Sequence, residues 1–390
     1  MSPRVLFLDH AAALGGAELY LLDVLRQRRA DGVGAEDRVI LFEDGPLVGR
    51  LREAGVAVEV VTASARVQTV AREAGPRQAL RAAPALVGQV LRLRRAARAA
   101  DVVFANSQKA LVVGALAAAL ARRPLVWNLH DILTAAHFSR FNARIAVGVA
   151  NRFARRVIVN SEATRASFVE AGGDAARAHV VYNGIDPAPF DAVTEADVAR
   201  VRAELGLTSA YVVGVFSRFS AWKGQHVLIE ALAGLPAVHA LFVGEALFGE
   251  DARYAADLRA RVAALGLGAR VHFAGFRADV PALMRAVDVV AHTSTAPEPF
   301  GRVIVEGMLA GKPVVATAAG GALEIVEDGV TGLLVPPGDA GALRAALARL
   351  AAAPEMASAL GAAGRKNAAE RFGLAAVAAL LTRHVDAARR

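Results

Sequence analysis

Apolar positions along the chain follow two alternating patterns. Short runs rich in Val, Leu and Ile have the length and β-branched composition of buried strands, and longer segments rich in Ala, Leu and Arg, such as 17–29 and 110–121, have helical spacing. Strands that alternate with helices predict βαβ units and a parallel sheet. The predicted strands are 5–8, 39–42, 56–61, 102–105, 125–129, 157–160 and 180–182 in the first half, and 211–216, 240–243, 271–273, 287–291 and 313–316 in the second.

Two closely spaced prolines interrupt this alternation near the middle of the chain. Pro187 and Pro189 mark a linker, and the alternation restarts with the strand at 211–216. We therefore expect an α/β protein with two doubly wound, Rossmann-like domains at 1–188 and 189–373. The final segment, 374–390, is predicted to be a helix that can pack back on the N-terminal domain.

Composition narrows the class of protein. At 390 residues the chain is long enough for two cores, and 55% hydrophobic against 21% charged residues indicates a packed globular protein. The absence of cysteine excludes disulfides and thiolate metal sites, and is compatible with a reducing compartment. A net charge of +8 favours an anionic partner such as a phosphorylated ligand, a membrane surface or nucleic acid. The same abundance of Arg can reflect the base composition of a genome, so the charge carries little weight.

The chain shows no targeting or membrane-spanning signal. Its first residues lack the apolar length and cleavage site of a signal peptide, and charges interrupt every long apolar run. We therefore expect a cytoplasmic protein. The segment 77–98 interleaves Leu, Val and Ala with six arginines. Such a helix can lie on an anionic membrane as a peripheral contact, or it can be packed on one face and solvated on the other.

In the first half, two motifs follow predicted strands. Gly15 and Gly16 precede Ala17 and Glu18 at the start of a helix, where a backbone without side chains can approach a phosphate closely. This pair is neither a GxGxxG fingerprint nor a Walker A loop, and paired glycines also serve ordinary turns.

His130 and Asp131 follow the strand at 125–129, so they belong to the same edge of the sheet. His130 can bind a ligand or transfer a proton, with Asp131 to orient it. The alternative is a capping Asp beside a partly buried His. His10 and His137 are isolated histidines to which we assign no more than a weak acceptor contact.

In the second half, a loop with two cations follows the strand at 211–216. Arg218 can form paired hydrogen bonds with phosphate oxygens, and Lys223 supplies a compact charge. Together they could neutralise a diphosphate, whereas as isolated surface charges they would mean little. Gly244 ends the next strand, where it serves either as a turn or as part of the same site.

Two carboxylates occupy the next strand–loop–helix junction. Glu298 lies in a loop after the strand at 287–291, and Glu306 lies in the helix predicted at 303–310, which ends at Gly311. Open α/β sheets bind ligands at such junctions, and the free N–H groups of a helix N-terminus favour anions or sugar hydroxyls. The alternative is an N-terminal acid and a surface Glu on an ordinary helix.

The order and spacing of these motifs resemble the family 4 glycosyltransferases of the GT-B fold over essentially the whole chain. The matching pieces are Gly15-Gly16-Ala17-Glu18, His130-Asp131, Asn183-Gly184-Ile185-Asp186, Arg218 with Lys223-Gly224, the pair Glu298 and Glu306, Gly320-Gly321 with Glu324, and Gly329 with Thr331-Gly332. The resemblance implies two Rossmann-like domains facing across a cleft. The N-terminal domain would bind the acceptor and the C-terminal domain a nucleotide-sugar donor, with retention of anomeric configuration.

The resemblance also implies roles for single residues. Glu306 would bind the ribose hydroxyls, and Glu298, with the backbone of Phe300, Gly301 and Arg302, would hold the donor sugar and phosphate.

By the same resemblance, Arg218 and Lys223 would stabilise the departing diphosphate, His130 would lie near the reacting sugar, and Gly16 would approach the diphosphate from the other domain. Gly15 and Gly244 complete the expected donor-binding set. The expected catalytic residues are His130, Arg218, Lys223 and Glu298. The donor would be a UDP- or GDP-sugar, used as a substrate, with no metal ion and no further cofactor. The acceptor would be a small molecule, a glycan or a lipid-linked hydroxyl, met by loops 64–76 and 135–142.

Preorganised cations lower the barrier to glycosyl transfer because negative charge collects on the leaving diphosphate. A retaining hydrolase is excluded, because its two carboxyl groups must lie roughly 5 Å apart. Eight positions of mostly helical chain separate Glu298 and Glu306 by up to about 12 Å.

Three other functions remain open at this stage. A sugar-nucleotide epimerase on the same architecture would use the same nucleotide contacts, and would convert the donor without an acceptor. A non-catalytic nucleotide-sugar-binding protein would not need the full set of cations and carboxylates. Nucleic-acid binding rests on the basic pI alone, because no aromatic residues are interleaved with the basic ones. We therefore expect no nucleic-acid partner.

Overall fold

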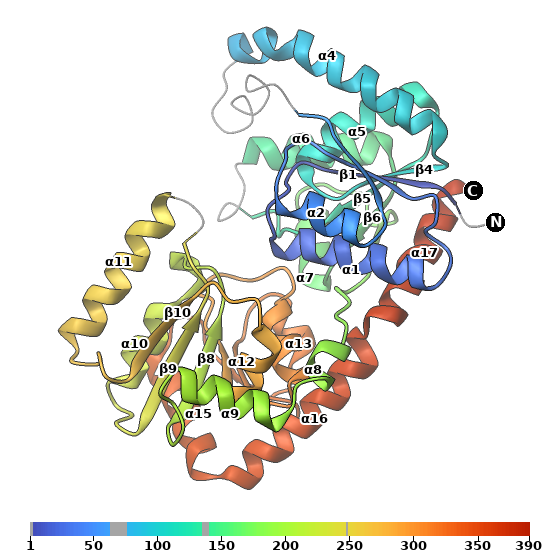
Figure 1. Ribbon diagram of the computed structural model, residues 1–390. Coiled ribbons are helices and arrows are strands. Elements are labelled where there is room, and N and C mark those ends of the chain that lie inside the picture. The colour runs from blue at the N-terminus through green and yellow to red at the C-terminus, as the bar shows by residue number, and fades with distance from the viewer. Residues whose placement is uncertain (1–2, 63–75, 135–139, 247–248) are drawn as a thin grey trace. The chain divides into compact units, whose positions relative to one another are not determined.

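The computed structural model describes residues 3–62, 76–134, 140–246 and 249–390, and it divides into two compact units. Unit 1 consists of Met1–Gly184 and Leu374–Arg390, and unit 2 consists of Ile185–Gly373. The helix at the end of the chain therefore belongs to the same unit as the N-terminal half (Figure 1). The expected acceptor loop 64–76 lies outside the described residues apart from Pro76, and so does most of the loop 135–142.

Unit 1 is built on a seven-stranded parallel sheet with the order β3-β2-β1-β4-β5-β6-β7. Its strands are β1 (Val5–Asp9), β2 (Arg38–Leu41), β3 (Ala57–Val60), β4 (Val102–Ala105), β5 (Leu125–Leu129), β6 (Ala154–Val159) and β7 (Ala178–Val180). Its helices are α1 (Gly16–Ala30), α2 (Pro46–Glu53), α4 (Pro76–Ala99), α5 (Gln108–Ala121), α6 (Arg140–Phe153), α7 (Glu162–Glu170) and α17 (Leu374–Arg389).

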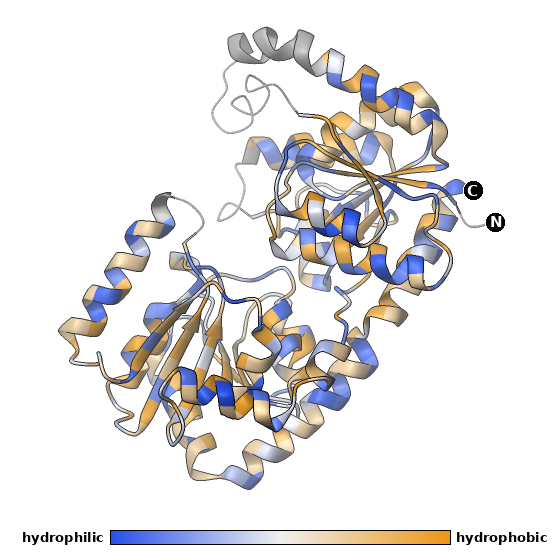
Figure 2. Ribbon diagram, in the orientation of Figure 1, coloured by the Kyte–Doolittle hydropathy of each residue, from blue (hydrophilic) through white to orange (hydrophobic). Residues whose placement is uncertain are grey.

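The strands of unit 1 are apolar on both faces, as a parallel sheet covered by helices requires. Along β1, Leu6 and Leu8 belong to the core formed with α4, α5, α6 and α7, whereas Val5 and Phe7 belong to the core formed with α1, α2 and α17. Figure 2 shows this as strands that are mostly hydrophobic between helices of mixed hydropathy.

A buried ion pair connects three elements of unit 1. Arg28 of α1 places Nε 2.8 Å from Asp37 Oδ2, and these side chains are only 1% and 2% exposed. The N–H of Val5 donates to Asp37 Oδ1, and Arg28 Nη1 donates to Thr382 Oγ1 on α17 at 2.7 Å. This pair therefore joins α1, the start of β1 and the final helix.

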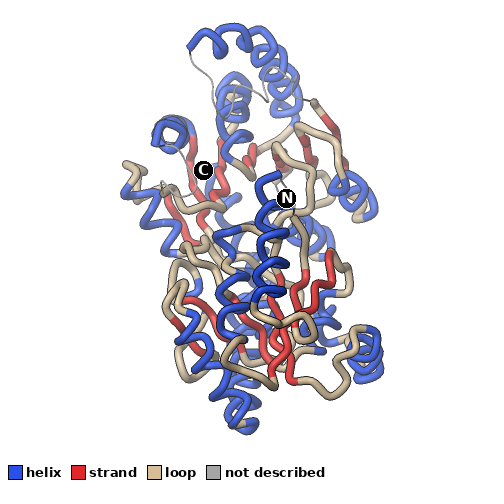
Figure 3. The backbone as a smooth tube through the Cα atoms, turned by 90° about the vertical axis from the view of Figure 1, so that its left-hand side faces the viewer, coloured by secondary structure: helices blue, strands red, loops and turns tan. Residues whose placement is uncertain are grey.

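Unit 2 is built on a six-stranded parallel sheet with the order β10-β9-β8-β11-β12-β13. Its strands are β8 (Tyr211–Phe216), β9 (Val238–Val243), β10 (Val271–Gly275), β11 (Val289–His292), β12 (Val314–Thr317) and β13 (Leu333–Val335). Its helices are α8 (Ala188–Asp191), α9 (Glu195–Glu204), the 3-10 turn η1 (Ala221–Lys223), α10 (Gln225–Leu232), α11 (Gly249–Ala264), α12 (Val280–Ala286), α13 (Arg302–Leu309), α14 (Ala322–Ile325), α15 (Ala340–Ala352) and α16 (Pro354–Phe372). The backbone trace in Figure 3 shows helices flanking the strands in each unit.

The two parallel α/β sheets confirm the predicted fold class, and the differences are local. The strand expected at 180–182 runs instead over Ala178–Val180, because it pairs with Val157–Val159 of β6. The strand Leu333–Val335 was not predicted, since three apolar residues before two prolines are too short to show a period.

We expect Arg28→Met to destabilise the protein by about 3–5 kcal/mol, because the buried Asp37 carboxylate would lose its countercharge. Arg26→Met, on the exposed side of the same helix, should change stability by less than about 0.5 kcal/mol. Urea denaturation of both variants measures the difference. Equal stability of the two variants would show that the pair contributes nothing.

Candidate functional site

Glu298 lies in the loop between β11 and α13, at the carboxyl edge of the unit 2 sheet. One of its oxygens, Oε1, collects three contacts: Lys223 Nζ at 2.5 Å, Ser294 Oγ at 2.5 Å and His292 Nε2 at 3.0 Å. Lys223 comes from the loop after β8, whereas the other two residues end or follow β11. The carboxylate therefore joins two neighbouring strand ends.

The surroundings of Glu298 keep it ionised. Burial raises the pKa of this carboxyl, but the charges of Lys223 and His292 and the hydrogen bonds from both outweigh burial. The pKa of Glu298 consequently lies well below its usual range. A buried anion whose contacts converge on a single oxygen keeps acceptor capacity on its other oxygen for a hydroxyl donor.

Two residues around Glu298 were missed from the sequence. His292 is the last residue of β11 and places Nδ1 3.2 Å from Thr317 Oγ1 at the end of β12, which orients its ring. Ser294 is buried two positions later. The sequence feature that could have identified them is the polar run His292-Thr293-Ser294-Thr295 directly after a buried strand.

The loop after β8 places both predicted cations around one indole ring. Lys223 Nζ lies 4.2 Å from the centre of the Trp222 ring, and Arg218 Cζ lies 5.8 Å from it. The buried amide of Gln225 donates to Ser217 Oγ and to the Arg218 carbonyl, at 2.9 and 2.8 Å. The sequence did not single out Trp222 or Gln225, although together they fix where the cations lie.

Close backbone approach holds the neighbouring loops together. Gly224 has φ +68, and a Cβ there would lie 1.9 Å from the Thr293 carbonyl oxygen. Gly320 has φ +60, and a Cβ there would lie 2.2 Å from the Glu298 carbonyl oxygen. Both positions therefore require glycine. Gly244, at the end of β9, is packed in the same way against the Ser217 backbone.

The helix α13 carries the remaining predicted residues of unit 2. Gly301 caps its N-terminus, and Arg302 Nε lies 3.4 Å from Glu306 Oε1 one turn later. The side chain of Phe300 is buried and packs edge-on against Phe372. Glu306 is partly exposed.

In unit 1 the equivalent edge carries a hydrogen-bond chain that ends at His130. Asn106 Nδ2 donates to the buried Asp9 Oδ2 at 2.6 Å, which turns Asn106 Oδ1 toward His130 Nε2 at 3.0 Å. Asn128 Nδ2 also donates to Asn106 Oδ1 and lies 2.8 Å from His130 Nε2. The ring packs edge-on against Tyr20. His130 is therefore held by residues from the ends of β1, β4 and β5, of which the sequence had identified only His130.

The glycine pair leads into a titratable carboxylate. Gly15 caps α1 and Gly16 is its first residue, and a Cβ on Gly15 would lie 2.5 Å from Glu18 Oε2. Burial, followed by the charge of Asp9, raises the pKa of Glu18 to about 7. Asp131 is exposed, and its charge acts in the same direction.

Two further expectations concern a metal site and the isolated histidines His10 and His137. Among the described residues, no three His, Asp or Glu side chains are grouped so that they could hold a metal ion. His10 Nδ1 lies 3.4 Å from Asp9 Oδ1, and His137 falls outside the described residues.

Comparison with known proteins assigns both halves to one enzyme class. The family model described as "Glycosyl transferases group 1" matches residues 198–367, and "Glycosyltransferase Family 4" matches residues 47–189. The D-inositol 3-phosphate glycosyltransferase of Mycobacterium sp. (strain JLS) is 38% identical over 48% of this chain and 43% of that protein. The lipopolysaccharide core biosynthesis glycosyltransferase LpsE of Rhizobium meliloti is 35% identical over 46% of this chain and 51% of that protein. The chain thus spans about half the length of the curated relatives it matches.

Solved structures match over the whole chain. Anabaena Alr3699/HepE in complex with UDP and glucose is 44% identical, with a TM-score of 0.88, and the match covers 98% of this chain and 99% of that one. The same protein with UDP-glucose gives 43% identity and a TM-score of 0.88. Sucrose-phosphate synthase from Thermosynechococcus elongatus, at 24% identity and a TM-score of 0.79 over 99% of each chain, shares the fold.

We expect Lys223→Met to lower stability by about 3 kcal/mol, because it leaves the buried Glu298 carboxylate without its principal countercharge. The double variant Lys223→Met, Glu298→Gln should recover most of this loss. Urea denaturation of the wild type, both single variants and the double variant gives the coupling free energy. Additive effects would show that the pair is not energetically coupled.

The raised pKa of Glu18 predicts a pH-dependent loss of stability. Its folded-state pKa of about 7 exceeds the ordinary value of 4.5, so the protonated form is favoured in the folded protein, and stability falls as pH rises from 4.5 through 7. Glu18→Gln should therefore raise the melting temperature at pH 8.5 and leave it nearly unchanged at pH 4.5, as measured by thermal unfolding. Glu53→Gln, at an exposed position of α2, is the control. An equal shift at both pH values would argue against titration of Glu18.

Proposed function

Because the chain belongs to the family 4, group 1 glycosyltransferases of the GT-B fold, we propose that it transfers a sugar from a nucleoside-diphosphate donor to a hydroxyl acceptor, with retention of anomeric configuration and without a metal ion. The observation that carries this proposal is the ionised, buried Glu298 beside Lys223 at a strand–helix junction. That arrangement offers an acceptor for sugar hydroxyls next to cations for a diphosphate.

We propose UDP as the nucleotide of the donor. The Anabaena protein was solved with UDP, with UDP and glucose, and with UDP-glucose, and its match to this chain includes both units. UDP-glucose is therefore the first donor to test, ahead of GDP-sugars. Glu306 would hold the ribose hydroxyls, and Glu298 the sugar. The N–H groups at the start of α13 would face the phosphates.

Departure of the diphosphate is the step that the cations serve. Negative charge grows on the leaving group in the transition state, and fixed positive groups stabilise it there more than in the ground state. Lys223 is paired with Glu298, and Arg218 lies against the same Trp222 ring as Lys223. Both cations would stabilise the departing diphosphate. The leaving phosphate would accept the acceptor proton on the same face, so no protein nucleophile is required.

His130 is assigned to the sugar rather than to the diphosphate. Asp9 and Asn106 fix the position of its Nε2, and Tyr20 supports one side of the ring. A residue held in this way is suited to orient a hydroxyl group by hydrogen bonding.

We propose a cytoplasmic enzyme that meets its acceptor, a small molecule, a glycan or a lipid-linked hydroxyl, with peripheral membrane contact through α4. In the described part of α4, Leu93 and Ala97 pack into the core, whereas Val87 and Leu91 are 55% and 50% exposed beside Arg95. Exposed apolar side chains beside arginines suit an anionic bilayer surface. No described helix is long and apolar enough to span a membrane.

A donor panel tests the proposed activity. Thermal shift with UDP, GDP and ADP identifies the nucleotide, and hydrolysis of the matching sugar donors identifies the sugar. An epimerase would instead convert the donor into a different nucleotide sugar with no acceptor present. Absence of any nucleotide-induced shift would refute the proposal.

We expect Glu306→Ala to weaken UDP binding by roughly tenfold, because the ribose hydroxyls would lose a charged acceptor worth about 1.4 kcal/mol. Isothermal titration calorimetry measures the change. Glu355→Ala, an exposed carboxylate on α16, should leave the affinity as it is. Unchanged affinity in Glu306→Ala would overturn the assignment of this residue to the nucleotide.

A further inference from the structure

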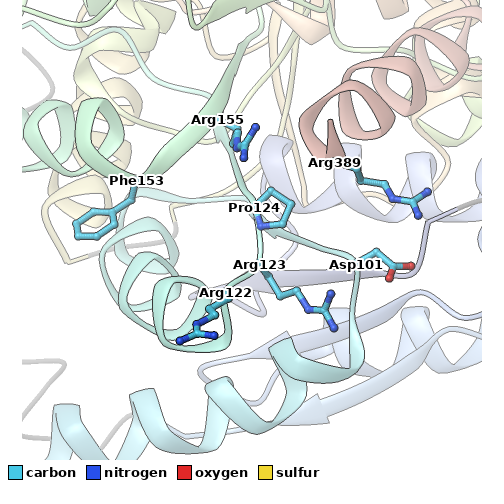
Figure 4. A pocket seen from close by; sticks show the side chains of 7 residues that line it. All are labelled: Asp101, Arg122, Arg123, Pro124, Phe153, Arg155 and Arg389. Atoms are coloured by element: carbon cyan, nitrogen blue, oxygen red, sulfur yellow. The ribbon is translucent and has the colours of Figure 1, made fainter.

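A basic cavity lies at the edge of the unit 1 sheet where the strands begin (Figure 4). Its volume is about 440 Å³, and its lining residues precede or open β4, β5 and β6 or end α17. They are Asp101, Arg122, Arg123, Pro124, Phe153, Arg155 and Arg389. Strand β5, which runs from this edge to the edge that carries His130, is five residues long, which places the two edges about 15 Å apart.

The charge of this cavity is strongly positive. Four arginines line it against a single carboxylate, and that carboxylate is already occupied. Asp101 accepts from the Arg4 N–H at 3.0 Å and from Arg4 Nη2 at 3.2 Å. Among the described residues, no carboxylate forms an ion pair with Arg122 or Arg155. The cavity therefore concentrates positive charge that the protein itself does not neutralise.

Arg122 occupies a backbone position that ordinarily suits glycine. It caps the C-terminus of α5 with φ 56 and ψ 45, and it is the one non-glycine residue with positive φ among the described residues. A side chain in this conformation costs about 1 kcal/mol. Glycine adopts this conformation without that cost, so Arg122 can be replaced by glycine without backbone strain.

One nitrogen of the Arg123 guanidinium is held by a hydrogen bond, whereas another has no hydrogen-bond partner among the described residues. Its Nη2 donates to the Arg98 carbonyl at 2.9 Å, at the C-terminal end of α4. Its Nε is buried, and no hydrogen-bond partner for it lies among the described residues. A guanidinium anchored through one nitrogen can offer its remaining N–H groups to an oxyanion without a further loss of side-chain entropy.

From these observations we propose that the cavity binds a ligand carrying two or more phosphate charges, at a site separate from the proposed donor site. Guanidinium groups match phosphate oxygens in geometry and charge, and the volume is that of a small-molecule site. Two sources present this chemistry: a soluble phosphorylated compound, and the headgroup of an anionic phospholipid. The contact between Arg123 and the end of α4 places the cavity beside the helix whose exposed face carries Leu91.

The test uses a double variant that should remain folded. Arg122→Gly places glycine where the backbone favours it, and Arg155 is exposed, so R122G/R155Q should match or exceed the wild-type melting temperature. The matched control is R50Q/R52Q, which removes two exposed charges from α2 in the same unit. Inorganic pyrophosphate is titrated into all three proteins by calorimetry at fixed ionic strength. Pyrophosphate that binds near Arg218 and Lys223 contributes equally to all three and cancels in the comparison.

We expect R122G/R155Q either to lose one class of pyrophosphate sites or to bind pyrophosphate at least tenfold more weakly at that class. The control R50Q/R52Q should behave as the wild type. Cosedimentation with vesicles of anionic phospholipid, compared with neutral vesicles, identifies the source. If the protein binds anionic vesicles, and this binding is displaced by pyrophosphate and lost in R122G/R155Q, the cavity is assigned to lipid headgroups. If the protein binds pyrophosphate but not the vesicles, the cavity is assigned to a soluble ligand. Identical titrations and identical cosedimentation for the variant, the control and the wild type would overturn the proposal. Loss of this site with donor hydrolysis intact would separate it from the proposed activity.

Discussion

The contact between Lys223 and Glu298 is the interaction on which the site of unit 2 depends. An ionised carboxylate in a buried position is tolerated only when it is paired and hydrogen-bonded, and here the partners come from two different loops. The loop after β8 and the loop after β11 must therefore adopt one mutual arrangement for the charge to be buried at all. The same contact limits how much of the Lys223 charge remains available to a ligand.

The loops can meet only because glycine lines the points of closest approach. The Lys223 loop touches the Thr293 carbonyl through Gly224, and the Glu298 backbone touches Gly320. The glycines of the sequence motif are thus spacing elements that bring polar groups from separate strands to one place. The His130 network of unit 1 achieves a comparable result with side chains, since Asp9 and Asn106 carry the connection between strand ends.

The sequence predicted most of the fold, because buried parallel strands and amphipathic helices leave strong periodic signals. It placed twelve of the strands and both sheets, and it failed at Leu333–Val335, where three residues carry no period. Within the site it identified the residues whose type is distinctive at a strand end, such as His130, Arg218 and Glu298. It missed His292, Ser294, Asn106 and Gln225. Their importance comes from contacts between residues far apart in the sequence, and without a fold those contacts cannot be enumerated.

The return of α17 to unit 1 has a consequence for biosynthesis. On the ribosome, residues 185–373 emerge as a continuous unit and can complete their core while α17 is still untranslated. Unit 1 cannot do so, because Val377, Leu381 and Val385 cover one face of its sheet and Thr382 receives the buried Arg28. The N-terminal unit, although synthesised first, therefore finishes second, and its apolar face stays uncovered until α17 has been synthesised.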